Sequence, residues 1–266
     1  MTTVIKLPDP ACGVVRELPV LLIDADILAV NKPAGVPVTL HPDQPEPSAL
    51  LPLLHNAIGS GKPWARAMQL EYLMPVHRPE PHTTGVLLFA RSAETLASLS
   101  DQFGSGKARQ EFSALVKGSP AENDFELNAK LSPHPDRPGQ LRADSRQGKR
   151  YRTRCQVLER FSRHTLLRCS PFPGRSGQVI AHLRHARYPV VADPDRGGAG
   201  IFLSQLKRDY EPKKNQPERP LIGRPALHLD SVTFAHPATG TEQSVLAPLT
   251  KDFNVALKYL RRFAMR

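Results

Sequence analysis

Alternation of polar and apolar residues is the feature of this sequence that most restricts its fold. Residues 150–161 ("RYRTRCQVLERF") and 163–172 ("RHTLLRCSPF") alternate with a period of two and are joined by a tight turn. Residues 110–118 and 124–131 show the same pattern earlier in the chain. Because successive side chains of a strand point to opposite faces of a sheet, this spacing predicts strands that follow one another in a meander.

Helical periodicity is less frequent than strand periodicity. The clearest helix covers residues 92–107, where Ser92 can cap the start, apolar residues recur at helical spacing, and Gly104 can end the helix. Helical patterns also occur in residues 48–58, 177–189 and 250–263. Since the strands come in runs rather than alternating with helices, we expect an α+β fold with a largely antiparallel mixed sheet and flanking helices.

The charge balance favours an anionic partner. The 266 residues include 36 Lys and Arg against 25 Asp and Glu, which gives a net charge of +11 and a pI near 9.9. A surplus of this size favours RNA, DNA or an acidic membrane surface as a partner. A basic protein without any such partner is the open alternative, because composition alone does not choose between the two.

Cysteine usage and the first residues indicate a reducing cytoplasm. Cys12, Cys155 and Cys169 are far apart, and no Cys or His pair has the spacing of a zinc site. The N-terminus lacks the basic start and continuous apolar stretch of a signal peptide. No apolar run approaches the ~18 residues that a membrane helix needs. We therefore expect a cytoplasmic location, no membrane partner and no metal.

One carboxylate lies between two prolines in the stretch "VHRPEPHTTGVLLFAR", residues 76–91. Pro79 and Pro81 disfavour the α region for the residues before them, so Arg78 and Glu80 should both be extended. The segment "TTG" then predicts a turn, and "VLLFA" predicts a buried strand. Glu80 is either a rigid, solvated loop residue or an acid held stiffly for chemistry, and the local pattern leaves both open.

Five segments together resemble the successive motifs of RluA-type RNA pseudouridine synthases. In chain order they are residues 27–38, 76–91, 110–118, 171–198 and 224–253. The resemblance implies a catalytic domain with an antiparallel sheet and a central RNA-binding cleft. It also implies isomerisation of uridine to pseudouridine in structured ribosomal or transfer RNA, no cofactor, and a monomer. We expect this domain to cover residues 21–266, preceded by an arm at residues 1–20 that is too short for an S4-type module.

The resemblance also assigns roles to individual residues. The family's HRLD-x-x-TSG motif aligns with "HRPEPHTTG", so the catalytic aspartate falls on Glu80, while Arg78 and Gly85 match. The tyrosine that lies beside the uracil ring is Phe112 here. The arginine that pairs with the aspartate comes from an RTHQIRVHL motif, which reads "RSGQVIAHL" here and places Ile180 at that position.

Other residues in and around the "RSGQVIAHL" segment match the family motif or could replace its missing arginine. Leu183 retains the apolar character of the uracil pocket, and Arg175 is expected to help bind the nucleotide. Arg184, four residues after Ile180 on the same helical face, could substitute for the missing arginine, as could Arg78. Whether either compensates is open.

The three departures affect the chemistry directly. Glu in place of Asp keeps the charge but moves it by about one methylene, on the order of 1 Å, which can cost ~10²-fold in rate. Phe112 retains ring stacking but has no hydroxyl for proton transfer. Ile180 removes a charge partner that would keep the carboxylate ionised and oriented.

Two classes of function therefore remain. The first is an active RNA-modifying enzyme, and the second is an RNA-binding protein or chaperone that kept the fold without the chemistry. A DNA-binding protein is a third alternative.

Cationic side chains on one predicted strand could contact the phosphates of an RNA backbone, or they could only mark a solvated edge of the sheet. They are Lys149, Arg150, Arg152 and Arg154.

Overall fold

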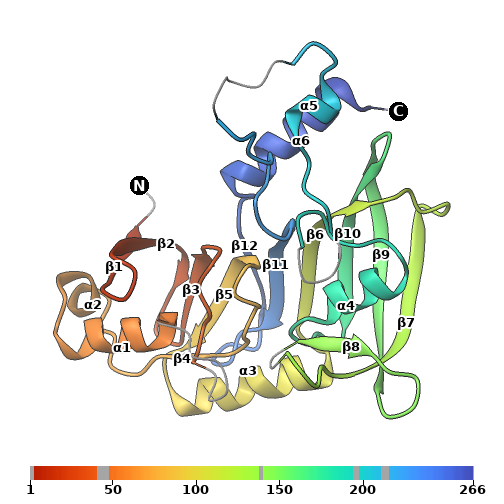
Figure 1. Ribbon diagram of the computed structural model, residues 1–266. Helices are drawn as coiled ribbons and strands as arrows, with labels where there is room; N and C mark the ends of the chain where they lie inside the picture. The colour runs from red at the N-terminus through yellow and green to blue at the C-terminus, as the bar shows by residue number, and fades with distance from the viewer. Residues whose placement is uncertain (1–2, 41–47, 138–139, 194–197, 211–215, 266) are drawn as a thin grey trace.

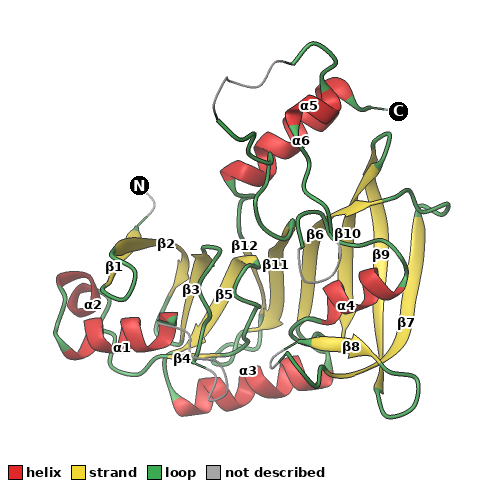
Figure 2. Ribbon diagram, viewed as in Figure 1, coloured by secondary structure: helices red, strands yellow, loops and turns green. Residues whose placement is uncertain are grey.

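The computed structural model describes residues 3–40, 48–137, 140–193, 198–210 and 216–265. These residues form one mixed 12-stranded sheet with helices around it (Figures 1 and 2). The strands are β1 (Val4–Asp9), β2 (Val14–Ile23), β3 (Ile27–Lys32), β4 (Met74–Pro75), β5 (Thr84–Ala90), β6 (Arg109–Lys117), β7 (Asp124–Pro133), β8 (Leu141–Ala143), β9 (Lys149–Arg160), β10 (His164–Phe172), β11 (Leu227–Ala235) and β12 (Glu242–Leu246). The helices are α1 (Leu50–Gly59), α2 (Pro63–Ala67), α3 (Ala93–Ser105), α4 (Gln178–His185), α5 (Leu203–Leu206) and α6 (Lys251–Phe263).

The strand order is β1-β2-β3-β5-β11-β6-β10-β9-β7-β8, with β12 paired to β11 and β4 to β5. The pair β5–β11 is parallel, and the other named pairs are antiparallel. The predicted meander is present in part: β7, β9 and β10 lie side by side in this order, whereas β6 pairs with β10 and β11 and not with β7, which follows it in the chain. The expected α+β fold with a largely antiparallel sheet is confirmed.

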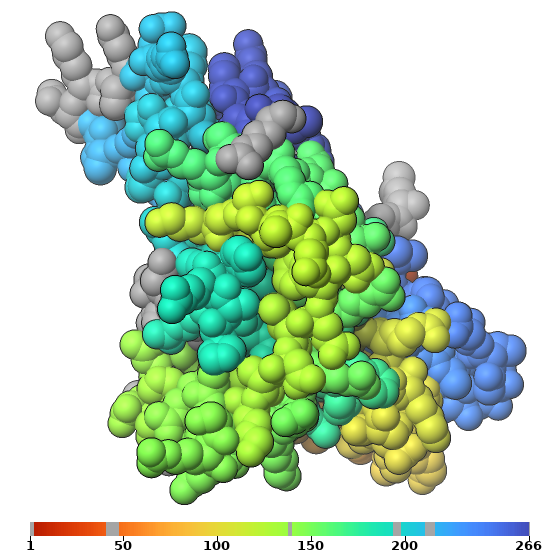
Figure 3. Space-filling model, turned by 90° about the vertical axis from the view of Figure 1, so that its right-hand side faces the viewer, coloured from red at the N-terminus to blue at the C-terminus, as the bar shows by residue number. Residues whose placement is uncertain are grey.

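Helices cover the two faces of the sheet in different places. The apolar strands β3 and β5 are buried on both faces, since α1 packs on the face with Leu28 and Phe89 while α3 packs on the face with Ala29 and Leu88. A third apolar cluster joins β6, β9 and β10 to α4 and α6. Figure 3 shows α4 in teal beside the green strands, and α3 in yellow beside the blue β11–β12 hairpin.

The helix predicted most clearly is α3, of 13 residues. The Ser92 side chain caps it by accepting the backbone N–H of Thr95 at 3.1 Å. The helix ends at Gly106 rather than Gly104, because the left-handed conformation at the C-cap (φ 79°) falls on Gly106. Within the described residues no helix is long and apolar enough to cross a membrane.

The first residues are part of the sheet. Residues 1–20 were expected as an arm, whereas β1 and β2 pair as an antiparallel hairpin that continues into β3. The Asp9 carboxylate ties this hairpin to the loop before α1 by accepting from Arg16 Nε at 2.7 Å and Ser48 Oγ at 2.6 Å. These hydrogen bonds, with the Arg16 charge, outweigh burial and hold the pKa of Asp9 at about 2.

The parallel pairing of β5 and β11 requires a glycine. Gly85 lies opposite Leu229 with φ +108°, and a Cβ at this position would lie 2.1 Å from the Leu229 carbonyl oxygen. Beside it, the Thr84 hydroxyl bonds Nδ1 of buried His228 at 2.8 Å, and His228 Nε2 lies 3.3 Å from the Ala247 carbonyl. Burial lowers the pKa of His228 to about 4, so the ring is neutral and can serve both contacts.

Candidate functional site

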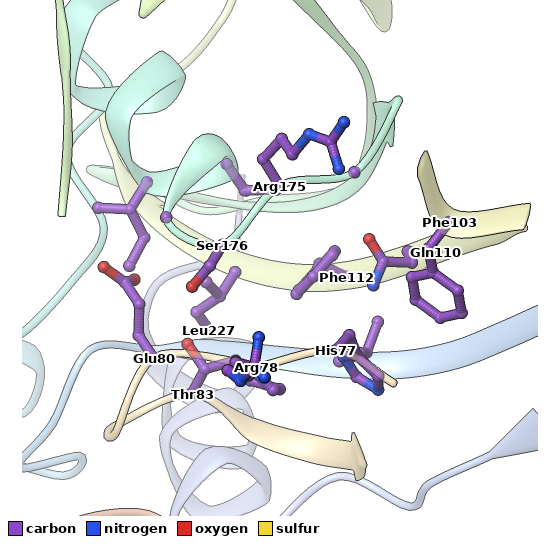
Figure 4. Close-up of a pocket in the computed structure, with 16 residues that line it drawn as sticks. His77, Arg78, Glu80, Thr83, Phe103, Gln110, Phe112, Arg175, Ser176 and Leu227 are labelled. Atoms are coloured by element: carbon purple, nitrogen blue, oxygen red, sulfur yellow. The ribbon is translucent and has the colours of Figure 1, made fainter. Parts of the chain in front are cut away.

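One cleft brings together residues that are far apart in the sequence (Figure 4). Its free space is about 460 Å³, with the solvent at its mouth included. The walls come from the loop before β5, the start of β6, β11, and the loop that leads into α4. Five residues singled out from the sequence line it: Arg78, Glu80, Phe112, Arg175 and Ile180.

Glu80 opens a tight turn at the edge of this cleft. The Thr83 N–H donates to the Glu80 carbonyl at 3.0 Å, with Pro81 in the second position, where its fixed φ suits a turn. The turn predicted at Thr83–Gly85 is therefore wrong by three residues, and β5 already begins at Thr84. The two prolines hold Glu80 at the point where the chain turns into a buried strand.

A buried lysine side chain holds this turn in place through hydrogen bonds. Lys32 is 1% exposed, and its Nζ donates to the carbonyls of Pro81 at 2.7 Å, Thr83 at 3.0 Å and Pro33 at 3.0 Å. Three acceptors match the three N–H groups of an ammonium ion. Burial lowers the pKa of Lys32 to about 7, so the group is charged below that pH. The carbonyls of the Glu80 turn thus depend on one side chain from β3.

His77 supports the same loop through one ring contact and one hydrogen bond. Its ring stacks on Phe103 with 5.2 Å between centroids, and its Nε2 accepts the backbone N–H of Leu88 at 3.2 Å. Burial lowers the pKa of His77 to about 3, which keeps the ring neutral and able to accept. The next residue, Arg78, is exposed and lies beside Thr83 in Figure 4.

The Glu80 carboxylate approaches the first turn of α4. A Cβ placed on Gly177 would lie 3.3 Å from Glu80 Oε1 and 3.5 Å from the backbone nitrogen of Leu141. Gly177 is the N-cap of α4 and has φ 74°, so it suits glycine both by its backbone and by the space beside it. A carboxylate is favourable near a helix N-terminus, where backbone N–H groups point outward.

The start of α4 is anchored to the sheet by one glutamine. Gln178 is fully buried, and its Nε2 donates to the Arg152 carbonyl at 2.8 Å and to Thr153 Oγ1 at 3.2 Å. Its Oε1 accepts the backbone N–H of Arg175 at 3.1 Å. These bonds set the position of the loop that carries Arg175, Ser176 and Gly177 into the cleft.

The structure separates the remaining α4 residues from the cleft. Ile180 is buried and lines it, but Leu183 is fully buried in the core cluster of α4, β9 and β10. Arg184 is exposed and does not line the cleft. The suggestion that Arg184 replaces the arginine missing at Ile180 is therefore not supported, because helical spacing fixes the face and not the reach of the side chain.

Strand β6 supplies a flat apolar wall together with β11. Phe112 and Gln110 lie on the same face of β6, and Leu227 and Leu229 of β11 lie beside them. No sequence pattern pointed to Gln110, which is 8% exposed and whose Oε1 occupies the space of a Cβ on Gly174. An apolar slot with one carboxylate and exposed arginines at its mouth suits a planar polar ring on an anionic backbone.

The predicted cationic strand faces a different side. Arg152 and Arg154 alternate with Thr153 and Cys155, which are buried beneath α4, so the arginines point from the opposite face of the sheet. Arg154 is bound to Asp124 by two hydrogen bonds at 2.9 and 2.5 Å. Lys149 and Arg150 are exposed at the start of β9.

Comparison with known proteins places the chain among RNA-modifying proteins. The sequence profile of a family described as RNA pseudouridylate synthase matches residues 26–185. Ribosomal large subunit pseudouridine synthase C of Salmonella typhi is 32% identical over 243 residues, which cover 91% of this chain and 70% of that protein. The synthase of the same name from Haemophilus ducreyi is 30% identical over 246 residues, 92% of this chain and 70% of the relative.

Solved structures share the fold at lower identity. Human RNA pseudouridylate synthase domain containing 4 matches with a TM-score of 0.66 at 18% identity, covering 91% of this chain and 92% of the human one. Human RNA pseudouridylate synthase domain containing 1 matches with a TM-score of 0.61 at 18% identity, covering 94% and 96%.

Proposed function

The chain belongs to the RluA-type RNA pseudouridylate synthase family, and from this membership we propose that it isomerises uridine to pseudouridine with Glu80 as the reacting carboxylate. The observation that carries the proposal is the cleft, whose lining includes both Glu80 and Phe112. The names of the relatives suggest the RNA of the large ribosomal subunit as the substrate. As the domain boundary, we propose residues 21–266, whose sheet is extended by β1 and β2 through the pairing of β2 with β3.

The reaction rearranges one bond and leaves the composition unchanged. The bond between C1′ of the ribose and N1 of uracil breaks, the ring turns, and a bond between C1′ and C5 forms. C5 loses its proton and N1 gains one, so no oxidant or cofactor enters. A duplex hides these atoms, so the uridine must leave its stack to reach Glu80.

The cleft residues have distinct roles in this proposal. Glu80 is the nucleophile, held by the Pro81 turn and by Lys32. Phe112 stacks on the uracil ring, and Ile180 contributes apolar wall. Arg78 and Arg175, both exposed at the mouth, hold the phosphates beside the flipped nucleotide.

A competing proposal is an RNA-binding protein without turnover. The missing hydroxyl at Phe112 and the apolar Ile180 favour it, because neither can transfer a proton or pair with a carboxylate. Tritium release separates the two proposals. Purified protein is mixed with large-subunit rRNA labelled with [5-³H]uridine from cells that lack it. Tritium release equal to that without protein would reject the synthase.

The space at Gly177 predicts a coupling with Glu80. We expect Gly177→Ala to lower kcat about tenfold, because the added Cβ, 3.3 Å from Oε1, pushes the carboxylate by a few tenths of an ångström. In a Glu80→Asp background the shorter side chain withdraws from Gly177, so the same substitution should change kcat by less than about twofold. The measurement is tritium release by the four proteins of this cycle.

Thermal melting of the same four proteins is the control. Alanine at φ 74° is strained in both backgrounds, so Gly177→Ala should lower the melting temperature equally with Glu80 or Asp at position 80. Equal losses of kcat in both backgrounds would contradict the coupling and assign Gly177 a purely conformational role.

A further inference from the structure

A half-exposed aromatic ring lies outside the cleft with an arginine over it. Phe172, the last residue of β10, is 49% exposed. The guanidinium carbon of Arg152 lies 5.4 Å from the centroid of its ring, and the two residues are direct partners across β10 and β9. A single exposed apolar side chain is ordinary on a protein surface, but this one offers the face of an aromatic ring together with a cation.

The chain connects this pair to the cleft on two sides. Two residues after Phe172 comes Gly174, and the next residue is Arg175; both line the cleft. The ring of Phe172 also lies against the end of α3, since a Cβ on Gly106 would be 2.7 Å from it. Three residues before Gly106, Phe103 lines the cleft as well. The pair therefore lies at the rim, where β10 ends and the chain enters the site.

The two side chains are held differently. The Phe172 ring lies beside Gly106 at the end of α3, and the Arg152 backbone is held by the bond from Gln178 to its carbonyl at 2.8 Å. The Arg152 side chain is only loosely paired, with 3.9 Å to Glu126 and about half of each side chain exposed. Arg154, further along the strand, is tied to Asp124 by two hydrogen bonds. Of these two arginines, Arg152 is the one that can move to a ligand.

We propose that Phe172 and Arg152 form a stacking platform for an unpaired base of the RNA next to the target uridine, an inference that rests on the proposed function. Extracting a uridine from its stack leaves its neighbours without partners, and an aromatic ring replaces that stacking for any base. Arg152 lies over the same ring and contributes its charge to the base or to the adjoining phosphate. The platform extends the bound RNA from the cleft onto the opposite face of the sheet.

A fluorescent stem-loop RNA tests the platform without requiring turnover. Two probes carry a single loop uridine with 2-aminopurine on either its 5′ or its 3′ side. With the wild-type protein one probe should lose fluorescence on binding, because 2-aminopurine is quenched when it stacks. Phe172→Leu, which keeps an apolar contact with α3 but has no ring, should remove this quenching and weaken binding about tenfold, as expected for one lost stacking contact. Phe172→Tyr should retain both.

Two further variants serve as matched controls. Leu158→Ala removes another exposed apolar side chain of β9, 38% exposed, and should leave affinity and quenching unchanged. Arg152→Gln should weaken binding while its backbone bond to Gln178 is kept. Equal melting temperatures of Phe172→Leu and the wild type show that α3 is intact.

The outcomes separate this inference from the function on which it rests. Wild-type protein that binds neither probe, and no other structured RNA, would overturn both. Wild-type binding that Phe172→Leu matches within twofold, with the same quenching, would overturn the platform alone and leave the synthase proposal standing.

Discussion

Glu80→Ala should release no tritium from [5-³H]uridine-labelled rRNA above the rate without protein, a loss on the order of 10³-fold or more. The substitution removes the carboxylate that faces the cleft and leaves the Glu80–Thr83 turn, because that turn uses the Glu80 carbonyl and not its side chain. RNA affinity should change by less than about threefold, since the exposed arginines at the mouth remain.

Two substitutions at the same position sharpen this expectation. Glu80→Gln keeps the shape without the nucleophilic charge and should be as inactive as the alanine variant. Glu80→Asp shortens the reach by about 1 Å and should lower kcat by roughly 10- to 100-fold, because the loop and Gly177 are arranged for the longer side chain. Faster turnover by Glu80→Asp would identify Glu80 as a degraded form of an aspartate site.

Lys32→Met should cause the largest loss of stability. It leaves three backbone carbonyls, those of Pro33, Pro81 and Thr83, without the Nζ donor in a buried place. Each lost partner costs about 1–3 kcal/mol, so the free energy of unfolding should fall by at least about 3 kcal/mol. Chemical denaturation measures this through the midpoint. Lys32→Arg is the size control and should also destabilise, because a planar guanidinium does not fit three converging carbonyls.

The pH dependence of the free energy of unfolding should reflect the titration of Lys32. The unfolded chain keeps the Lys32 proton up to about pH 10.5, whereas the folded protein releases it near pH 7. The unfolded state therefore binds more protons between these values, so the Lys32 contribution rises with pH from about 7 to 10.5 and is lost as pH falls to 7. Its slope is at most about 1.4 kcal/mol per pH unit.

The difference between wild type and Lys32→Met isolates this slope from all other titrating groups. Denaturation of both proteins at several pH values between 7 and 10 should show the free energy of unfolding of the wild type rising relative to that of Lys32→Met, by at most about 1.4 kcal/mol per pH unit. Parallel curves over this range would show that the pKa of Lys32 is not lowered in the folded protein.

The fold could be predicted from the sequence in those regions where a single local pattern determines the secondary structure. Period-two runs predicted the strands β6, β7, β9 and β10, and a cap with an apolar stripe predicted α3. The N-terminal hairpin was missed, since residues 1–20 were interpreted as an arm; Pro8 lies on the edge strand β1, where proline is tolerated. Its pairing is set by contacts with β3 and the Asp9 hydrogen bonds, which no local pattern reports.

The candidate site was only partly predictable, for a related reason. The family motifs selected Glu80, Phe112 and Ile180, and all three line one cleft. The roles of Lys32 and Gly177 come from contacts with residues that are distant in the sequence. Lys32 Nζ lies 2.7 Å from the Pro81 carbonyl oxygen, and Gly177 lies beside the Glu80 carboxylate. Such contacts join residues that are distant in the sequence, so the spacing of residues along the chain does not predict them.

The most direct test of the central claim is a pseudouridine map of total RNA from cells with and without the protein, by chemical labelling and primer extension. The account predicts that at least one site disappears on deletion, returns with the wild-type gene, and does not return with Glu80→Ala. An unchanged map, together with binding of the purified protein to structured RNA that weakens steeply with salt, would contradict it and make the cleft a binding site alone.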